Sequence, residues 1–357
     1  MALDLSPAAR IAGRGIAAVG ALAAGAAIGA FAERALVRGF RKSEEEDLGS
    51  LHGDVARIAM SDGTRLHVEI DEASDPTNPL TVIFAHGYAL TMDSWHYQRA
   101  ALRGRARLVF YDQRSHGRSE RADFDTHHVD QLGYDLSELI DQLAPDGPLM
   151  LVGHSMGGMT IMALADERPE LFRDRVFGVA LIATSAGALE QGSLGLPSAL
   201  STAFHRLAPP VAALLARQKG LVEKTRWSDT DLGLLVTRVY AFGSNVPDQA
   251  SRFVAGMLSS TPIDVVAEFL PALQEHDKYH ALSVLQHVEL LVIAGDHDRL
   301  TPKEMSDEIV AAVPGAEYVI VRNAGHMVTI EKHEEVNRLL LELLGRVQRD
   351  LAEGMDP

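Results

Sequence analysis

A serine between two glycines follows a short apolar run near the middle of the chain. The segment Gly153–Gly157 reads Gly-His-Ser-Met-Gly and comes directly after the apolar run 149–152, which is typical of a buried strand. Residues 159–165 behind it are compatible with a packed helix. A serine on a sharp strand-to-helix turn, with small residues on either side, is typical of an exposed nucleophile. The pattern therefore predicts that Ser155 performs covalent catalysis.

A serine hydroxyl needs a general base, and that base needs a carboxylate to orient it. The predicted base is His326, which lies in a glycine-containing loop after the last strand expected in the chain. Two carboxylates, Asp296 and Asp298, follow the preceding apolar run, and both qualify by location. We expect one to orient the histidine and the other to cap the helix that begins near Pro302, although Thr301 is the more natural cap.

The elements that must position these residues alternate between short apolar runs and helix-compatible segments. Residues 55–60 and 65–70 alternate apolar and polar side chains around a glycine-bearing turn, which predicts an antiparallel hairpin. An amphipathic helix is expected from about Glu334. The order predicts an α/β fold with a mostly parallel central sheet flanked by helices. Its fully buried strands are expected at 81–85, 108–111, 149–152 and 176–183, and two more strands at 288–294 and 318–321.

The interval 188–283 breaks this alternation. It contains apolar helical patterns, including 208–215 and 232–242, and no convincing central strand. A helical insertion between two strands is the economical interpretation, and such an insertion usually roofs a ligand pocket. The predicted organisation is an N-terminal segment with linker at 1–45, a core in two parts at 50–187 and 284–350, and a helical cap at 188–283 between them.

These residues together resemble the α/β-hydrolase superfamily, and the resemblance covers about Val55 to Val347. The segment His86-Gly87-Tyr88 resembles the family loop that supplies an amide to the oxyanion hole. The resemblance implies that the backbone amides of Tyr88 and Met156 face the developing oxyanion. The segment 112–119 resembles a family loop with the pattern D-x-R-x-x-G-x-S, and we expect it to brace loops near the site.

Two further segments carry the same resemblance. The family usually places its acid three residues after a glycine, in the pattern G-x-x-D-x-x-x-P. Gly295, Asp298 and Pro302 match that spacing, which favours Asp298 over Asp296 as the partner of the histidine. The segment from His326 through Glu331 to 337 is similar to the usual C-terminal block of the family.

Composition and the remaining histidines exclude several other functions. Lys and Arg number 33 against 49 Asp and Glu, and the net charge of −16 argues against binding nucleic acid. Without cysteine there is no disulfide, no Cys-zinc site and no thiol nucleophile. The histidine pairs 127–128 and 276 with 280 have metal-like spacing but no supporting acidic cluster, so we expect no metal. No phosphate-binding glycine loop is present, and we expect no cofactor.

The N-terminal segment differs from the rest of the chain. Residues 15–32 are uncharged and lie between arginines, and about 18 residues is the short end of what spans a bilayer. The favoured interpretation is an uncleaved membrane anchor. A secretory signal cleaved after Ala30-Phe31-Ala32 is an alternative, and a packed or disordered segment on a cytoplasmic protein is another. The side of the membrane and the oligomeric state stay open.

The predicted function is hydrolysis of a carboxylic ester through an acyl-enzyme. Peptidases, thioesterases, carbon–carbon bond hydrolases and cofactor-free perhydrolases of the superfamily use the same triad, and the sequence does not separate them. A non-catalytic ligand-binding protein with a hydrolase fold is the alternative from another class. A hydrophobic acyl or lipid-like substrate would fit the apolar residues of the cap, which could equally be ordinary core: Leu194, Leu196, Leu200, Phe204, Leu207, Phe253, Met257, Leu258 and Phe269.

Overall fold

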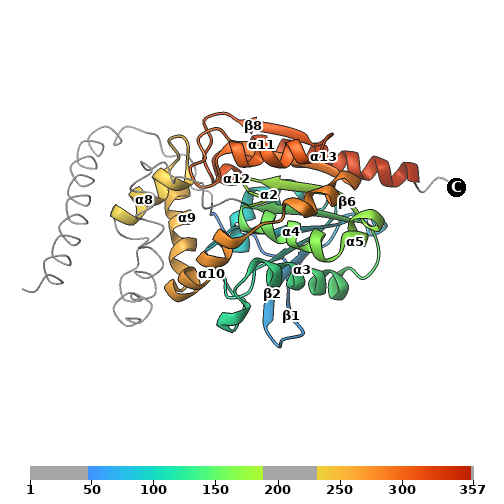
Figure 1. The fold of residues 1–357 in the computed structure, drawn as a ribbon, viewed down its shortest axis with the longest axis horizontal. Coiled ribbons are helices and arrows are strands. Elements are labelled where there is room, and N and C mark those ends of the chain that lie inside the picture. The colour runs from blue at the N-terminus through green and yellow to red at the C-terminus, as the bar shows by residue number, and fades with distance from the viewer. Residues whose placement is uncertain (1–46, 188–230, 355–357) are drawn as a thin grey trace, which may run out of the picture.

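The computed structural model describes residues 47–187 and 231–354. They form one eight-stranded sheet with helices on both faces (Figure 1). The strand order is β1-β2-β4-β3-β5-β6-β7-β8, and the strands from β4 onward along this order run parallel. The predicted α/β fold is therefore confirmed. The strand bounds are β1 Asp54–Ala59, β2 Arg65–Asp71, β3 Thr81–Ala85, β4 Arg107–Tyr111, β5 Leu149–His154, β6 Val176–Ile182, β7 Glu289–Gly295 and β8 Glu317–Val321.

The predicted hairpin is formed by β1 and β2, which pair antiparallel from Asp54↔Ile70 to Ala59↔Arg65. The six strands predicted from apolar runs are β3 to β8, each within one or two residues of its expected bounds. Because side chains of a strand alternate between faces, such runs fill two cores at once. In β5, Leu149 and Leu151 enter one core cluster, whereas Met150 and Val152 enter the other.

Helices on the two faces complete these cores. One face is covered by α3 (Val129–Leu143), α4 (Met156–Glu167), α5 (Pro169–Asp174), the 3-10 helix η5 (Tyr279–His287) and α11 (Lys303–Ala312). The opposite face is covered by η1 (Met92–Trp95), α2 (His96–Leu102), α12 (Val328–Glu331) and α13 (His333–Gly354). The apolar stripe of α13, from Val336 to Leu351, is buried against the sheet. This is the amphipathic helix expected from about Glu334.

Three α-helices lie between β6 and β7 in the described residues, before the 3-10 helix η5. They are α8 (Asp231–Ala241), α9 (Asp248–Ser260) and α10 (Ile263–Glu275), and we call them the roof helices. Residues 231–287 contain no strand, in agreement with the helical pattern predicted at 232–242. The other predicted helical pattern, 208–215, and five of the nine apolar cap residues lie in 188–230, outside the described residues. The domain boundaries therefore stay predictions.

Residues 15–32 also lie outside the described residues. Within 47–187 and 231–354, no single helix has the length and apolar composition needed to cross a membrane. The pair α9 and α10 reaches that length and composition only together, and it bends by 91° at the break between the two helices.

Candidate active site

Ser155 lies on a strained turn between β5 and α4. Its φ of 53° and ψ of −119° fall in a region that non-glycine residues rarely occupy. The turn is fixed by the amide of Ser155, which donates to the carbonyl of Ile182, and by the hydroxyl of Thr184, which donates to the carbonyl of Ser155 across 2.7 Å. These two hydrogen bonds, from β6 and the residues directly after it, hold Ser155 in its strained conformation.

The two glycines that flank the serine are required by close packing. A Cβ at Gly157 would lie 2.0 Å from the carbonyl oxygen of Ala85, and one at Gly153 would lie 2.5 Å from the carbonyl oxygen of Gly157. Real Cβ atoms do not approach backbone so closely. Glycine at both positions is what lets α4 begin directly beside β3 and β5.

The three side chains of the predicted triad meet at the carboxyl edge of the parallel strands. His326, in the loop after β8, places its Nε2 2.9 Å from the Oγ of Ser155. Its Nδ1 lies 2.9 Å from Oδ2 of Asp298, in the loop after β7. His326 is 7% exposed and Asp298 is 6% exposed, whereas Ser155 is only partly buried. His326 is 171 residues from Ser155 and 28 from Asp298 along the chain, and the parallel sheet brings the three residues together.

The carboxylate of Asp298 is buried and ionised. Burial alone would raise its pKa, but the charge and hydrogen bond of His326 and the hydrogen bonds from Thr301 outweigh that effect and lower the pKa below its usual value. The backbone amides of Leu300 and Thr301 donate to Oδ1 at 2.8 and 3.0 Å. Asp298 can therefore hold the proton of Nδ1 and leave Nε2 free to accept from the serine.

Thr301 contributes a contact to this site that the sequence did not predict. Its hydroxyl donates to Oδ2 of Asp298 across 2.8 Å. The hydroxyl oxygen of Thr301 also lies 3.2 Å from Nδ1 of His326. The expectation that Thr301 caps the next helix is wrong, because the N-cap of α11 is Pro302. Asp296 does not cap that helix either. It is exposed and accepts a hydrogen bond from the amide of Ala324 at 3.3 Å.

The segment predicted to supply an oxyanion amide runs beside the elbow. β3 pairs parallel with β5, with Ala85 opposite Gly153, so the residues that follow each strand are neighbours. A Cβ at Gly87 would lie 2.9 Å from Nδ1 of His154, which shows how close the two segments are. In the described part of the chain, the backbone amides of Tyr88 and Met156 donate to no protein acceptor. Both amides are therefore available to an oxyanion, which is the role predicted for them.

A sequence profile of the alpha/beta hydrolase family matches residues 82–339. The chain belongs to this family. Matching residues include the elbow, the acid loop and the histidine loop, which together hold the three side chains described above.

The proteins to which this chain is similar are named for different activities. The dihydrolipoyllysine-residue acetyltransferase component of the acetoin cleaving system of Cupriavidus necator is 26% identical over 269 residues, which is 74% of this chain but only 63% of that relative. 3-Oxoadipate enol-lactonase 1 of Acinetobacter baylyi is 23% identical over 291 residues, or 82% of this chain and 97% of the lactonase. The crystal structure of the enol-lactonase from Burkholderia xenovorans has a TM-score of 0.65 and 24% identity, and covers 81% of this chain and all 100% of the lactonase.

Two other histidines near the elbow of this hydrolase are structural. His154 donates from Nε2 to the carbonyl of His326 across 2.9 Å, and burial together with the nearby imidazole of His326 lowers its pKa to about 3. His86 contacts the carbonyl of Gly87 through Nδ1, and its Nε2 accepts from the amide of Gln113. Burial lowers the pKa of His86 to about 4. Both rings are neutral at physiological pH and hold backbone segments, so neither competes with His326 for the role of base.

Three of the four histidines with metal-like spacing contact protein groups. His127 Nε2 lies 2.8 Å from the hydroxyl of Ser115, and His128 accepts from the amide of Gln131 at the start of α3. His280 lies 2.7 Å from the carboxylate of Asp166. Among residues 47–187 and 231–354, no group of three or more His, Cys, Asp or Glu could hold a metal ion.

The loop 112–119 braces its surroundings. Asp112 accepts from the amide of Met92 and from the amide of Arg118, each at 2.8 Å. Arg114 is fully buried and pairs with Asp135, with Nε 2.7 Å from the carboxylate. These contacts tie the loop to η1 and α3, beside the segment that carries Tyr88, and they agree with the structural role expected from the sequence.

Glu331 connects the histidine loop to the roof helices. Its carboxylate accepts from the amide of Gly325 at 2.7 Å, immediately before His326, and from the amides of Gly243 and Ser244 just after α8. The amide of Met327 donates to the carbonyl of Ala241 across 2.7 Å. The loop that carries His326 is thus anchored on both sides of the histidine to the end of α8.

Proposed function

We propose that this α/β hydrolase cleaves a carboxylic ester through an acyl-enzyme intermediate on Ser155. The observation that carries the proposal is the chain of two 2.9 Å contacts from Ser155 through His326 to Asp298. A serine next to a neutral imidazole that a buried carboxylate orients is an activated nucleophile. The relatives named as lactonases act on ester bonds by their names, and they share the fold with this chain.

In the proposed mechanism, Oγ of Ser155 attacks the ester carbonyl while Nε2 of His326 takes its proton. Asp298 stabilises the imidazolium, and the amides of Tyr88 and Met156 stabilise the oxyanion. His326 then returns the proton to the leaving alkoxide, and the acyl group stays on Ser155. A water, deprotonated by His326, then attacks the acyl carbon. The bond to Oγ of Ser155 breaks, His326 returns the proton to that oxygen, and the carboxylic acid leaves. No metal or cofactor takes part in these steps.

A fluorophosphonate probe tests the proposal, because it reacts only with an activated serine. We expect labelling of the pure folded protein and its loss in Ser155→Ala. Labelling that persists in Ser155→Ala, or none at all in the wild type, would favour the non-catalytic ligand-binding alternative. Turnover of p-nitrophenyl esters of increasing chain length then defines the acyl group. Selectivity for longer chains would support a hydrophobic or lipid-like substrate. Assays with thioesters, with peptides, and with esters plus hydrogen peroxide test thioesterase, peptidase and perhydrolase activity.

The membrane anchor at residues 15–32 is a second part of the proposal. It is supported by the uncharged run between arginines, which has about the minimum length that spans a bilayer. An anchored enzyme would be kept close to lipid-like esters.

A further inference from the structure

The linker that leads from the N-terminal segment into the domain is clamped to the core. The amide of Gly49 donates to Nδ1 of His96 at 3.1 Å. Arg99 donates to the carbonyl of Leu51 at 3.0 Å, and Arg103 to the carbonyl of His52 at 2.6 Å. Residues 49–53 therefore have a fixed position on the domain.

The groups that make this clamp are themselves held in a buried ionic network. The carboxylate of Glu69 accepts from the amide of Gly53 at 3.1 Å and from Arg99 at 2.6 Å. Asp71 accepts from both Arg99 and Arg103. The side chains of Glu69, Asp71 and Arg99 are at most 5% exposed. Paired, buried charges of this kind do not rearrange without a large cost, so the direction in which the linker leaves the domain is set.

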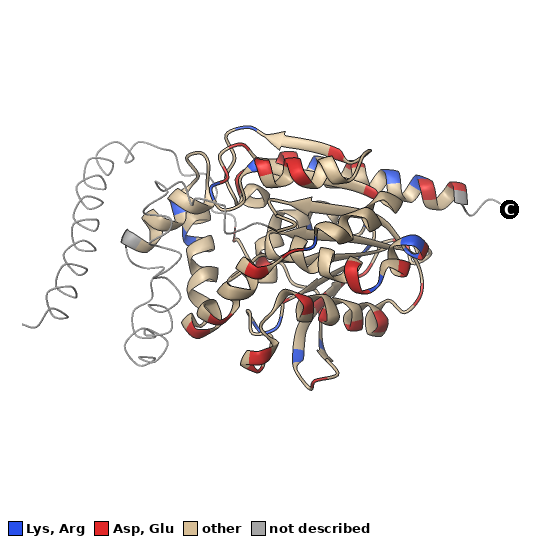
Figure 2. Ribbon diagram, viewed as in Figure 1, with Lys and Arg blue, Asp and Glu red and all other residues tan. Residues whose placement is uncertain are grey.

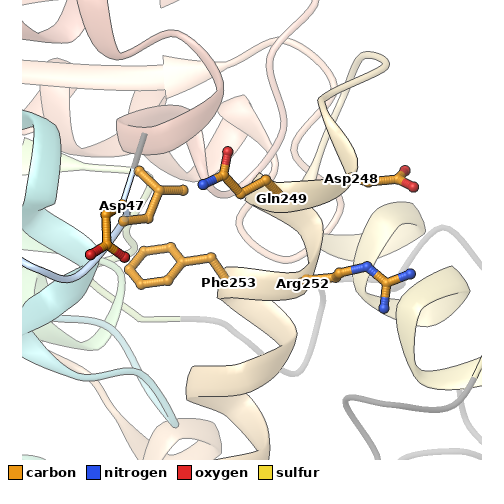
Figure 3. A pocket seen from close by; sticks show the side chains of 6 residues that line it. Asp47, Asp248, Gln249, Arg252 and Phe253 are labelled. Carbon is orange, nitrogen blue, oxygen red and sulfur yellow. The ribbon is translucent and has the colours of Figure 1, made fainter. Parts of the chain in front are cut away.

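The linker leaves the domain beside α9. Asp47 and Leu48 line a cavity of about 470 Å³ together with Phe253 and three other residues of α9 (Figure 3). A Cβ at Gly49 would lie 3.0 Å from the ring of Phe253. Phe253 packs on an apolar cluster formed by residues of α8 and α9 together with Leu90 and Met327. Leu90 lies in the loop after β3, and Met327 directly follows His326. The linker therefore emerges at the same edge of the sheet as the candidate active site.

The surface at this edge carries two exposed apolar side chains on neighbouring turns of α8. Val236 and Val239 are 37% and 38% exposed and lie three residues apart on one face of α8. On α8, α9 and residues 47–48, the basic residues Arg238 and Arg252 partly balance three aspartates, whereas α3 carries acidic residues alone (Figure 2). An anionic lipid surface therefore repels the surface of α3 more strongly than the surface formed by α8, α9 and residues 47–48.

We propose that the face formed by α8, α9 and residues 47–48 lies against a lipid bilayer, so that the edge of the sheet with Ser155 faces the membrane. The proposal rests on the proposed anchor at residues 15–32. The tether between them, residues 33–46, spans at most about 50 Å even when fully extended. A short tether with a fixed exit beside α9 would keep this face nearest the membrane and the C-terminal end of α13 farthest from it (Figure 1).

The orientation is measured by site-specific labelling, for which a chain without cysteine is suited. Full-length Arg252→Cys, on α9, and Asp174→Cys, at the end of α5 beside the opposite edge of the sheet, both replace exposed residues. Each variant is labelled with a fluorophore and reconstituted in phosphatidylcholine–phosphatidylglycerol vesicles that contain a lipid with a nitroxide headgroup. We expect at least about twofold quenching at position 252 and little at 174, because nitroxide quenching acts over short distances. Equal quenching, stronger quenching at 174 or failure to float with vesicles overturns the proposal.

A longer tether tests the consequence for activity. Inserting about 20 Gly and Ser residues between Lys42 and Ser43 keeps the anchor and adds roughly 25 Å of reach. We expect quenching at position 252 and hydrolysis of a vesicle-borne long-chain ester each to fall severalfold, with hydrolysis of a soluble short ester unchanged. No change in quenching or in vesicle-borne hydrolysis would overturn the proposal. If the protein without the insertion does not hydrolyse the soluble ester, the proposed esterase function is contradicted. The quenching result alone then decides the orientation.

Discussion

The hydroxyl of Thr301 donates to Oδ2 of Asp298 across 2.8 Å and lies 3.2 Å from Nδ1 of His326. The hydroxyl of Thr301 thus contacts both the carboxylate expected to orient the imidazole and the histidine expected to act as the base. A hydrogen bond to an ionised group contributes about 1.5–3 kcal/mol, and this one fixes the oxygen that the imidazole must face. Thr301 is therefore a positioning residue.

Replacing Thr301 with Val removes that hydrogen bond and keeps the side-chain shape. We expect kcat for a soluble ester to fall about tenfold, which corresponds to ~1.4 kcal/mol in the barrier, with KM nearly unchanged. Thr301→Ser is the matched control, because it keeps the hydroxyl and should retain most of the activity. Equal losses in Thr301→Val and Thr301→Ser would mean that packing of the methyl group, rather than the hydrogen bond, is what matters.

The nucleophile and base are tested by Ser155→Ala and His326→Ala. Removing one member of a triad costs several orders of magnitude in kcat, because the remaining members cannot act alone. We expect that loss in both variants, with thermal unfolding midpoints close to that of the wild type. Stopped-time assays with a p-nitrophenyl ester and circular dichroism give the two measurements. More than a tenth of the wild-type kcat in either folded variant would contradict the assignment.

Asp298→Asn and Asp296→Asn form a matched pair, since both carboxylates lie in the same loop. Asn at 298 can present its amide to Nδ1 and stabilise the wrong imidazole tautomer, so we expect a fall in kcat of several orders of magnitude. Asp296 is exposed and contacts only a backbone amide among the described residues, so its variant should keep nearly full activity. If Asp296→Asn proved the more damaging, the two roles would be exchanged.

The parts of this site that could be predicted are those fixed by chain topology. Ser155, Asp298 and His326 each follow a parallel strand, and the carboxyl ends of such strands meet at one edge of the sheet. Short apolar runs predicted the bounds of those strands to within one or two residues. The glycines of the elbow could be explained from the sequence alone, because only a backbone without Cβ allows so close an approach.

The direction of a side chain in a loop could not be predicted in the same way. Thr301 precedes a helix and has the residue type of an N-cap, yet its hydroxyl turns back to Asp298 because the carboxylate already binds the amides of residues 300 and 301. Glu331 gave no local signal of its role either. Its partners, Gly243 and Gly325, are 88 and 6 residues away, and only the folded chain brings them together.

Acid stability tests the buried network beneath the linker. Burial alone would raise the pKa of Glu69, but hydrogen bonds from Arg99 and the amide of Gly53 lower it to about 2, against 4.5 for an ordinary glutamate. A carboxylate with a lowered pKa in the folded state stabilises the fold fully above about pH 4.5. That contribution, at most about 3 kcal/mol, is lost as the pH falls from 4.5 towards 2.

We therefore expect the free energy of unfolding in urea to decrease steeply between pH 5 and about pH 3. Glu69→Gln should be less stable than wild type at pH 7 and should lose less stability over this range. Glu72→Gln is a suitable control, because Glu72 is exposed and pairs with Arg107 at the surface. Parallel pH profiles for the wild type and Glu69→Gln would show that the carboxylate of Glu69 is not ionised at an unusually low pH.

The last prediction concerns the N-terminal segment. Deleting residues 1–42 leaves the clamp at 49–53 and every segment of the candidate site in place, so hydrolysis of a small soluble ester should stay within about twofold of wild type. The deletion should also move the protein from the membrane fraction to the soluble fraction, because residues 15–32 are the proposed anchor. Fractionation with a carbonate wash measures this. Full-length protein that is already soluble would contradict the anchor, and a mature N-terminus at Glu33 would instead identify a cleaved signal peptide.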